Sequence, residues 1–338
     1  MPTEEDRFEL KQVSIDLTLG ASKAGLIVGQ PFFEVSRNSD PSFQIEPEYR
    51  EKQFEFVKEC FEVSRIEREE RNDHTQFILL PEFSVPWEES EKLQQLLSLL
   101  DDAASPLLLI AGIEGISVDS LKTFMADCDT VQEKPGFRGG GFLNLCLIAV
   151  KEEDDTVKLW LQQKVWPSQW EESRGHANGT RIYHFKGQDF SFVCELCSDH
   201  IGNVGNWSFT SELSRKISDS GASLDFLFAP QYNPKPLHES FSRATSDFLN
   251  GANRGVGDNT VVVVANRAAK SQEGTEYGRS GAYWRGDLWQ VAEDDLGPDG
   301  YSFEKWQSGG RGLVRALFRC QTCAIHGTSI RLAHCSSG

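Results

Sequence analysis

Short apolar runs of strand length recur along the chain, separated by polar turns or by helical patterns. The clearest run is 261–264, four valines in a row, which is typical of a strand covered on both faces. Strands buried on both sides need helices outside them. The pattern predicts further strands at 24–28, 77–80, 107–111, 143–150, 157–161, 190–196 and 224–229.

Helices are predicted where apolar side chains recur at three- and four-residue spacing. Residues 48–71 carry such a stripe, residues 93–100 repeat it, and a third helix is expected from 237 to 252. Strands and helices therefore alternate along much of the chain, which indicates an α/β fold.

One pair of strands departs from this alternation. Only the charged turn 151–155 joins the run at 143–150 to the run at 157–161, which predicts a hairpin and hence a mixed sheet. No internal repeat and no Pro- or Ser-rich linker divides the chain, so we expect one domain at 21–319. The end segments, 1–20 and 320–338, are expected to be loosely attached.

Composition and charge narrow the class of protein. The 338 residues are 39% hydrophobic and 25% charged, as in ordinary globular proteins, which excludes wholesale disorder. The formal charge of −17 repels phosphate backbones and anionic lipid surfaces, so neither nucleic acid nor a membrane is an expected partner. The acidic start and the absence of any apolar run of about 20 residues predict a soluble, cytoplasmic protein.

Eight cysteines in a chain of this length predict free thiols in a reducing compartment, since a large core does not depend on disulfides. The C-terminal set resembles a zinc-ligand pattern but lacks a second Cys-x-x-Cys pair, so no metal is expected there. This set consists of Cys320, Cys323, His326, His334 and Cys335.

Three predicted strands end in residues that can carry chemistry. The run at 77–80 leads through Pro81 to Glu82, and the run at 157–161 leads to Lys164. Trp and Pro residues enclose Lys164, and desolvation there is expected to lower its pKa. The third strand ends near two thiols, Cys194 and Cys197, either of which suits a nucleophile at a strand-to-helix turn. Each feature alone also has a structural interpretation.

In this order, the Glu, Lys and Cys positions resemble the carbon-nitrogen hydrolase (nitrilase) superfamily over about residues 24–318. Leu80-Pro81-Glu82 looks like its Pro-Glu motif, and Gln163-Lys164 with Pro167 looks like its Lys motif. The resemblance implies a four-layer α-β-β-α sandwich with mixed sheets, formed by residues 21–319. Further similar segments are 107–112, Asn144, 222–230, Asn253, Asn259, 261–266 and 278–281.

Two positions are open within this resemblance. The family's nucleophile is usually followed two residues later by an acid, which favours Cys197 with Asp199 over the alternative nucleophile Cys194. Residues 194 and 197 point to opposite faces, so only one of them can meet Glu82 and Lys164. For the additional Glu that positions the Lys in many members, the chain offers Glu171 and Glu172, of which we predict Glu172.

The resemblance implies a cysteine-dependent hydrolase that cleaves non-peptide carbon-nitrogen bonds of a small amide or nitrile through a thioester. Cys197 would attack, Glu82 would carry the proton, and Lys164 with the backbone N–H of Ser198 would hold the developing oxyanion. No metal or organic cofactor is expected, and the family commonly forms dimers. Two alternatives are acyl transfer from the same thioester and a non-catalytic binding or regulatory module on the same fold.

Overall fold

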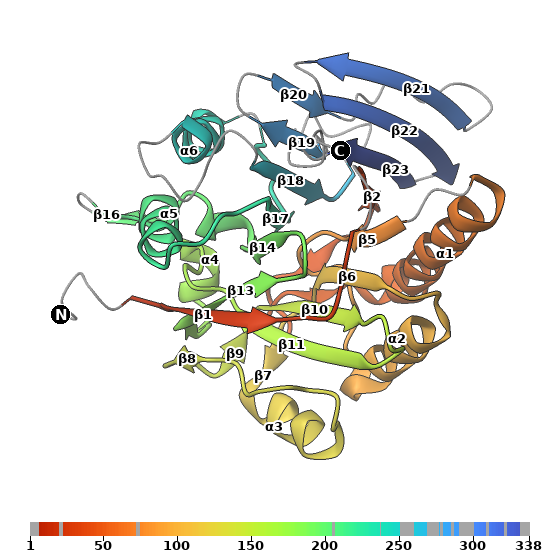
Figure 1. The fold of residues 1–338 in the computed structure, drawn as a ribbon. Coiled ribbons are helices and arrows are strands. Elements are labelled where there is room, and N and C mark those ends of the chain that lie inside the picture. The colour runs from red at the N-terminus through yellow and green to blue at the C-terminus, as the bar shows by residue number, and fades with distance from the viewer. Residues whose placement is uncertain are drawn as a thin grey trace.

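The computed structural model describes residues 7–19, 23–71, 75–204, 207–236, 238–250, 260–268, 277, 280–284, 287–290, 301–308, 311–320 and 323–331. Two large mixed sheets form its centre (Figure 1). The seven-stranded sheet has the order β1 (Glu9–Ser14), β13 (Arg181–Lys186), β14 (Ser191–Cys194), β17 (Phe226–Gln231), β18 (Val261–Asn266), β19 (Gly281–Trp284) and β20 (Asp287–Gln290).

The second large sheet has eight strands and carries the hairpin that the charged turn predicted. Its order is β11 (Val157–Gln163), β10 (Leu145–Lys151), β6 (Leu107–Gly112), β5 (Thr75–Leu79), β2 (Lys23–Gln30), β23 (Cys323–Arg331), β22 (Arg311–Cys320) and β21 (Tyr301–Ser308). β10 and β11 pair antiparallel, whereas β2, β5 and β6 run parallel, so the predicted mixed sheet is confirmed.

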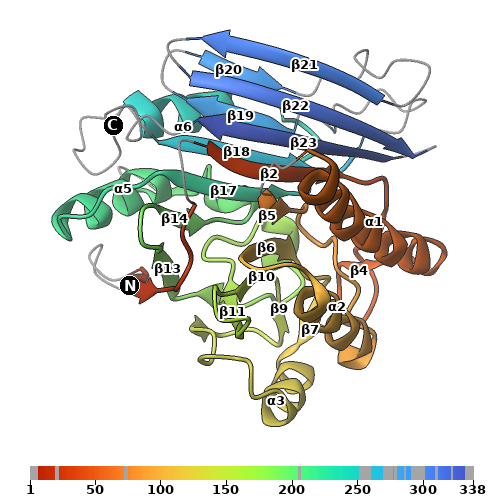
Figure 2. The ribbon, with the colours of Figure 1, turned by 45° about the vertical axis from the view of Figure 1, so that its right-hand side comes forward.

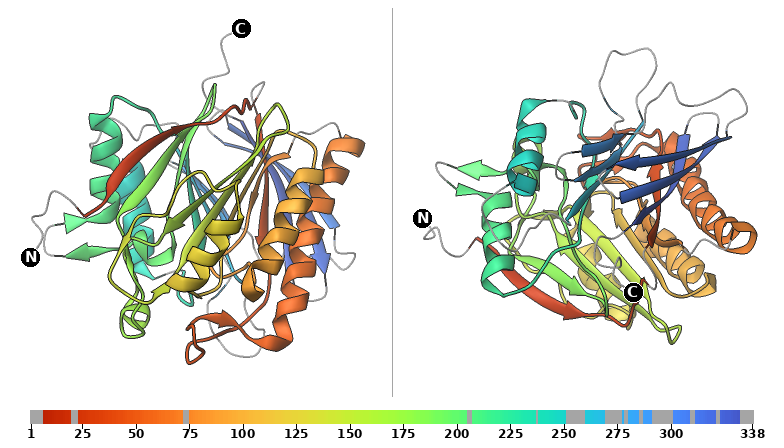
Figure 3. Two further views of the ribbon diagram at one scale, coloured as in Figure 1. Left: turned by 90° about the horizontal axis from the view of Figure 1, so that it is seen from below. Right: turned by 45° about the horizontal axis from the view of Figure 1, so that its top comes forward.

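Helices cover the outer face of each sheet, as Figures 2 and 3 show from three sides. α1 (Pro47–Arg71) and α2 (Glu91–Asp102) pack on the eight-stranded sheet, and α3 (Val118–Asp127) adds Leu121 and Phe124 to the same apolar cluster. α5 (Phe209–Asp219) and α6 (Glu239–Asn250) pack on the seven-stranded sheet. The predicted four-layer α-β-β-α sandwich is therefore confirmed, and the three predicted helices correspond to α1, α2 and α6.

Alternation along the strands builds these layers. In β5, Phe77 and Leu79 point into the core between the two sheets, while Ile78 points toward the helices. The four valines of β18 divide in the same way, with Val261 and Val263 between the sheets and the other two facing α5 and α6. Because the side-chain period of a strand is two, a continuous apolar run fills two cores at once.

The end segments 1–20 and 320–338, which were predicted to lie outside the domain, both contain strands of the large sheets. β1 pairs in parallel with β13 along its whole length, and β23 pairs with both β2 and β22. The backbones of Cys320 and Cys323 pair at the end of the β22–β23 ladder, and His334 and Cys335 lie outside the described residues, as do Asn253, Asn259, Gly278 and Arg279. The domain boundaries themselves stay a prediction.

The remaining elements are short. Two-stranded pairs join β3 (Val35–Ser36) with β4 (Gln44–Ile45), β7 (Ile116–Ser117) with β9 (Phe142–Leu143), β8 (Phe137–Arg138) with β12 (Asn178–Gly179), and β15 (Asn203–Val204) with β16 (Trp207–Ser208). The single-turn elements are α4 (Gln169–Glu172), η1 (Glu88–Ser90) and η2 (Cys197–Asp199). In the described part of the chain, no helix combines the length and the apolar character needed to cross a bilayer.

Candidate active site

The predicted site residues come from the ends of strands in both sheets. Glu82 follows β5, and Lys164 directly follows β11, both in the eight-stranded sheet. Cys197 opens η2, three residues beyond the end of β14 in the seven-stranded sheet. The structure brings these three residues together, so the site spans the two sheets.

Lys164 lies at the centre of this cluster and is fully buried, with 2% of its surface exposed. Its Nζ donates to Glu82 Oε1 at 2.6 Å and to Glu171 Oε2 at 2.9 Å. Asn144 Nδ2 bridges the same carboxylates, at 2.7 Å from Glu82 Oε1 and 2.6 Å from Glu171 Oε1. One ammonium and one amide therefore fix two buried carboxylates side by side.

The pKa of Lys164 differs from the expectation. Burial on its own would lower the pKa of Lys164, as predicted from its apolar neighbours. The carboxylates of Glu171 and Glu82, with a smaller contribution from Cys197, outweigh burial and hold this pKa well above its ordinary value. Lys164 is therefore an ammonium throughout the physiological range, and the prediction of a lowered pKa is wrong.

The pKa values of the two carboxylates are shifted in opposite directions. Burial raises the pKa of Glu82, and the attraction of Lys164 offsets this only in part, because the charge of Glu171 opposes ionisation. Burial also acts on Glu171, but Lys164, Asn144 and Ser168 outweigh it and lower the pKa of Glu171. Glu171 is thus the fixed anion, whereas Glu82 is the carboxylate prepared to take up a proton.

Cys197 is half-buried and has a backbone φ of 39°, in the left-handed region that non-glycine residues rarely adopt. Burial raises the pKa of the Cys197 thiol well above its usual value, and the charge of Glu82 adds to this. The ammonium of Lys164 and the backbone N–H of Tyr232 act in the opposite direction. The thiol is therefore protonated at rest and needs a base to become a nucleophile.

Cys194 has a different environment. Its side chain lies in the core between the sheets with no exposed surface, and burial followed by its contact with Cys146 raises its pKa well above the usual value. Residues 194 and 197 thus point in different directions, although strand alternation is not the cause, because Cys197 lies in η2, beyond the end of β14. The structure places Cys197, and not Cys194, with Glu82 and Lys164.

The prediction of Glu172 as the additional glutamate is wrong in position, because its side chain is exposed. Glu171 takes that place, with 1% of its surface exposed. α4 begins with a capping box in which Ser168 Oγ accepts from the N–H of Glu171, and Glu171 Oε2 accepts from the N–H of Ser168 at 2.7 Å. This box turns the third residue of the helix back toward its N-terminus, where Lys164 lies.

Two further residues tie the Cys197 turn to the Lys164 segment. Buried Asp199 accepts hydrogen bonds from the N–H groups of Trp166 at 2.6 Å and Leu196 at 3.1 Å. The Ser198 hydroxyl donates to the carbonyl of Trp166 at 2.6 Å. In the sequence, Asp199 only favoured Cys197 over Cys194 as the nucleophile. Its contact with Trp166 joins segments more than 30 residues apart, which the spacing of residues in the sequence does not indicate.

A second buried chain of contacts fixes the turn from the other side. His200 Nδ1 contacts Glu195 Oε1, and His200 Nε2 lies 2.7 Å from Thr245 Oγ1 on α6.

Within the described ranges, no group of three or more His, Cys, Asp or Glu side chains has the arrangement of a metal site. The chemistry of the cluster is that of an acid-base pair beside a thiol.

No family model matches the chain, and no curated protein matches it. Among solved structures, an amidase from Nesterenkonia sp. has a TM-score of 0.49 at 11% identity, covering 91% of this chain and 90% of the amidase. A variant of the Nesterenkonia AN1 amidase, from the nitrilase superfamily, has a TM-score of 0.48 at 11% identity, covering 81% of this chain and 87% of that chain. A glutamine-dependent NAD⁺ synthetase from Acinetobacter baumannii has a TM-score of 0.48 at 11% identity and covers 89% of this chain, which spans 47% of the synthetase. These likenesses are of fold alone.

Proposed function

We propose that the protein is a cysteine-dependent hydrolase of the amidase type, which cleaves a non-peptide carbon-nitrogen bond with Glu82, Lys164 and Cys197. One observation carries this proposal above all. A permanent ammonium is held at 2.6 Å from a carboxylate of raised pKa, and both groups act on the pKa of a half-buried thiol. A base, a cation and a nucleophile near one another are the groups that acyl transfer through a thioester requires.

In the first half of the reaction, Cys197 Sγ forms a bond to the carbonyl carbon of the amide, and Glu82 takes the thiol proton. The negative charge moves to the substrate oxygen, where the Lys164 ammonium and the backbone N–H of Ser198 stabilise it. Lys164 Nζ donates to Glu82 Oε1 and to both oxygens of Glu171, and the longest of these bonds, 3.2 Å to Glu171 Oε1, is the one that can be exchanged for the substrate oxygen. Glu82 then passes its proton to the leaving nitrogen as the carbon-nitrogen bond breaks.

In the second half, water attacks the carbonyl carbon of the thioester. Glu82 removes a proton from this water, and a second tetrahedral intermediate forms with its negative oxygen near Lys164. The carbon-sulfur bond of this intermediate then breaks. The sulfur regains a proton from Glu82, so the thiol and the carboxylate return to their starting states. Glu171 takes no part in these transfers and acts as a positioning residue, since it fixes Lys164 in place as an ammonium.

The test is detection of the thioester by intact-protein mass spectrometry after incubation with short aliphatic amides. We expect an acyl adduct on the native protein and on Cys194→Ala, but none on Cys197→Ala. Cys194→Ala is the matched control, because it removes a thiol three residues away that faces the core. An adduct that disappears only in Cys194→Ala would contradict the proposed nucleophile.

A second measurement separates the enzyme from a non-catalytic module on the same fold. The acyl adduct should form much more slowly in Glu82→Gln than in the native protein, because glutamine can neither accept the thiol proton nor pass a proton to the leaving nitrogen. Absence of both the adduct and amide turnover in the native protein would contradict the proposed hydrolase.

A further inference from the structure

Arg267 is a buried cation whose surroundings differ from those of the other buried cations. Among the side chains that the structure describes, the buried cationic ones are Lys92, Lys151, Lys164 and Arg267. Each lysine has a carboxylate within ion-pair distance, from Glu51, Asp155 and Glu82 respectively. Arg267 is 3% exposed and has no carboxylate partner within the described ranges. A buried charge without a counterion is costly, so its retention requires a reason.

The donors of Arg267 are only partly used. Its Nη1 donates to the carbonyl of Phe33 at 2.7 Å, while Nε is buried and has no hydrogen-bond partner among the residues that the structure describes. A guanidinium has five N–H groups in one plane, and its geometry fits the two oxygens of a carboxylate. Arg267 therefore keeps the donors with which an anion can be bound.

Aromatic rings surround the guanidinium. Its central carbon lies 3.6 Å from the ring centroid of Tyr277, 5.0 Å from that of Tyr232 and 5.3 Å from that of Phe32. These faces partly compensate the charge in the absence of an anion. They also keep water away, which strengthens a hydrogen bond between the guanidinium and a carboxylate.

Tyr232 joins Arg267 to the candidate active site. The backbone N–H of Tyr232 donates to Glu82 Oε2 at 3.1 Å, while its ring faces the guanidinium. Asn266, the last residue of β18 (Figure 2), fixes this loop through two hydrogen bonds of 2.9 Å with the backbone of Asn233. Tyr232 therefore contacts Glu82 through its backbone and Arg267 through its ring.

We propose that Arg267 binds a carboxylate of the substrate, so that the amide cleaved at Cys197 belongs to an anionic molecule. The simplest such substrate is the monoamide of a short dicarboxylic acid, which with one water gives the dicarboxylate and an ammonium ion. This inference rests on the proposed function, because it assigns the substrate class of the same site. Arg267 is the specificity-determining residue in this assignment.

The test compares kcat/KM for two matched pairs, succinamate with butyramide and glutaramate with valeramide. We expect the native protein to prefer the anionic amide of each pair, and Arg267→Met to lower this preference about 10- to 100-fold. Arg267→Lys keeps the charge without the planar fork and should retain part of the preference. The control Arg181→Met removes a guanidinium that pairs with Glu9 and Glu133 at the surface, and it should leave the preference unchanged.

Binding of glutarate to Cys197→Ala, measured by isothermal titration calorimetry, tests the same assignment without turnover. Loss of glutarate binding on adding Arg267→Met, in a variant with native circular dichroism, supports the inference. An unchanged preference in Arg267→Met, or no glutarate binding in a protein that cleaves butyramide, overturns the inference but leaves the proposed hydrolase intact. Absence of both turnover and acyl adduct with every amide overturns the proposed function itself.

Discussion

Adjacent glutamates in α4 have opposite environments, and the reason is local. Glu171 is the third residue of a helix capped by Ser168, so its carboxylate turns back to the helix start and reaches Lys164. Glu172, about 100° further around the helix, faces solvent. The Ser-x-x-Glu spacing of a capping box is readable in the sequence and would have favoured Glu171. The spacing from Lys164 that the family resemblance suggests could not decide between the adjacent residues Glu171 and Glu172.

Replacement of Glu171 by Gln should lower kcat by about 100-fold, because Lys164 loses the carboxylate that fixes it and a small misplacement of a catalytic group has this effect. The alkaline limit of activity should also move to lower pH. Glu171 is the larger of the two carboxylate contributions that raise the pKa of Lys164, so its removal lets the ammonium lose its proton earlier. The pH profiles of kcat and of kcat/KM measure the two effects.

Glu172→Gln is the matched control, since it makes the same chemical change on an exposed side chain of the same helix. It should leave both the rate and the alkaline limit unchanged. If the two variants have the same profile, Glu171 does not position Lys164.

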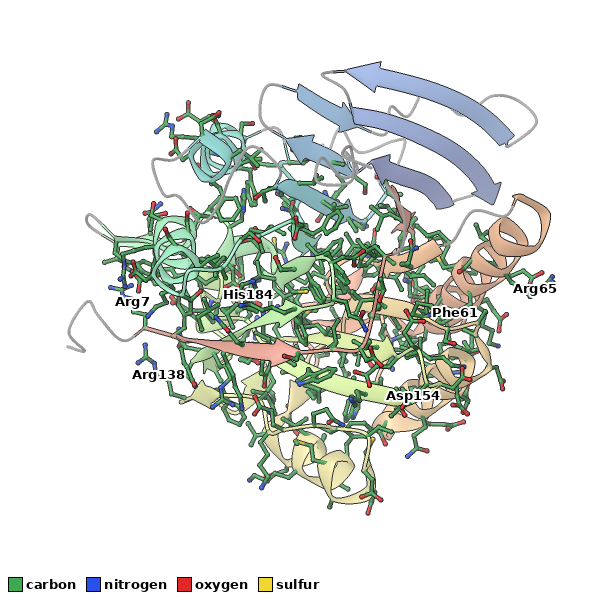
Figure 4. All side chains as sticks on the ribbon, in the orientation of Figure 1. Arg7, Phe61, Arg65, Arg138, Asp154 and His184 are labelled. Carbon is green, nitrogen blue, oxygen red and sulfur yellow. The ribbon has the colours of Figure 1, made fainter. Side chains whose placement is uncertain are left out.

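His184 in β13 carries a prediction about stability and pH. It lies inside the molecule (Figure 4) with no exposed surface, and burial, assisted by the charge of Lys186, lowers its pKa to about 4. Below about pH 6.5 the unfolded chain protonates this imidazole, while the folded protein does not until about pH 4. The contribution to stability is therefore complete above pH 6.5 and declines as the pH falls toward 4.

His184→Leu isolates this contribution, because leucine cannot be protonated. Between pH 6.5 and 4, the free energy of unfolding of the native protein should fall by roughly 3 kcal/mol relative to that of the variant, which corresponds to the shift from 6.5 to about 4. Urea unfolding at a series of pH values measures the difference. If the free energies of unfolding of the two proteins depend on pH in the same way, His184 has the same pKa in the folded and the unfolded chain.

At the scale of elements, strand ends position the site, and one glycine sets the closest approach. Gly112 ends β6, and a Cβ at this position would lie 2.4 Å from Glu82 Cα and 2.5 Å from Phe83 N. The Gly112 N–H donates to the carbonyl of Pro81 at 3.0 Å. The sequence indicates segment 107–112 only as one that resembles the family, and the reason for its final glycine is visible only in the structure, because the contact lies across the sheet.

Gly112→Ala should displace the Glu82 backbone, since the contacted atoms are main chain and cannot rotate away. We expect a loss of about 1 to 3 kcal/mol in the free energy of unfolding and a decrease of about 100-fold in kcat/KM. Gly141→Ala is the control, because a Cβ there meets no atom within 4 Å. Equal activity of the two variants would show that the β6 end does not hold Glu82.

For the whole molecule, the sequence indicated the helices and the local hairpin better than it indicated which distant strands pair. Local periodicity located α1, α2 and α6, and the charged turn located the β10–β11 hairpin, because these signals are contained within a few residues. The partners of β1 and β23 could not be predicted in this way. Each pairs with a strand more than 150 residues away, and nothing within a single strand specifies a distant partner.

The core between the sheets should decide whether the site exists at all, because Glu82 and Lys164 follow strands of one sheet and Cys197 follows a strand of the other. Phe77 of β5 is 1% exposed, and its ring centroid lies 5.5 Å and 5.4 Å from those of Phe226 and Phe228 on β17. Phe77→Ala should therefore lower the free energy of unfolding by about 3 to 5 kcal/mol.

Phe77→Leu keeps most of the buried volume and should cost less than half as much, which separates the loss of packing from the loss of the aromatic ring. Because one continuous core joins the sheets, urea should unfold each variant in a single transition, with activity and far-ultraviolet circular dichroism lost together. Two separate transitions in Phe77→Ala would mean that each sheet is stable with its own helices. In that case, contacts among the loops at the strand ends, and not the shared aromatic core, would bring Cys197 to Glu82 and Lys164.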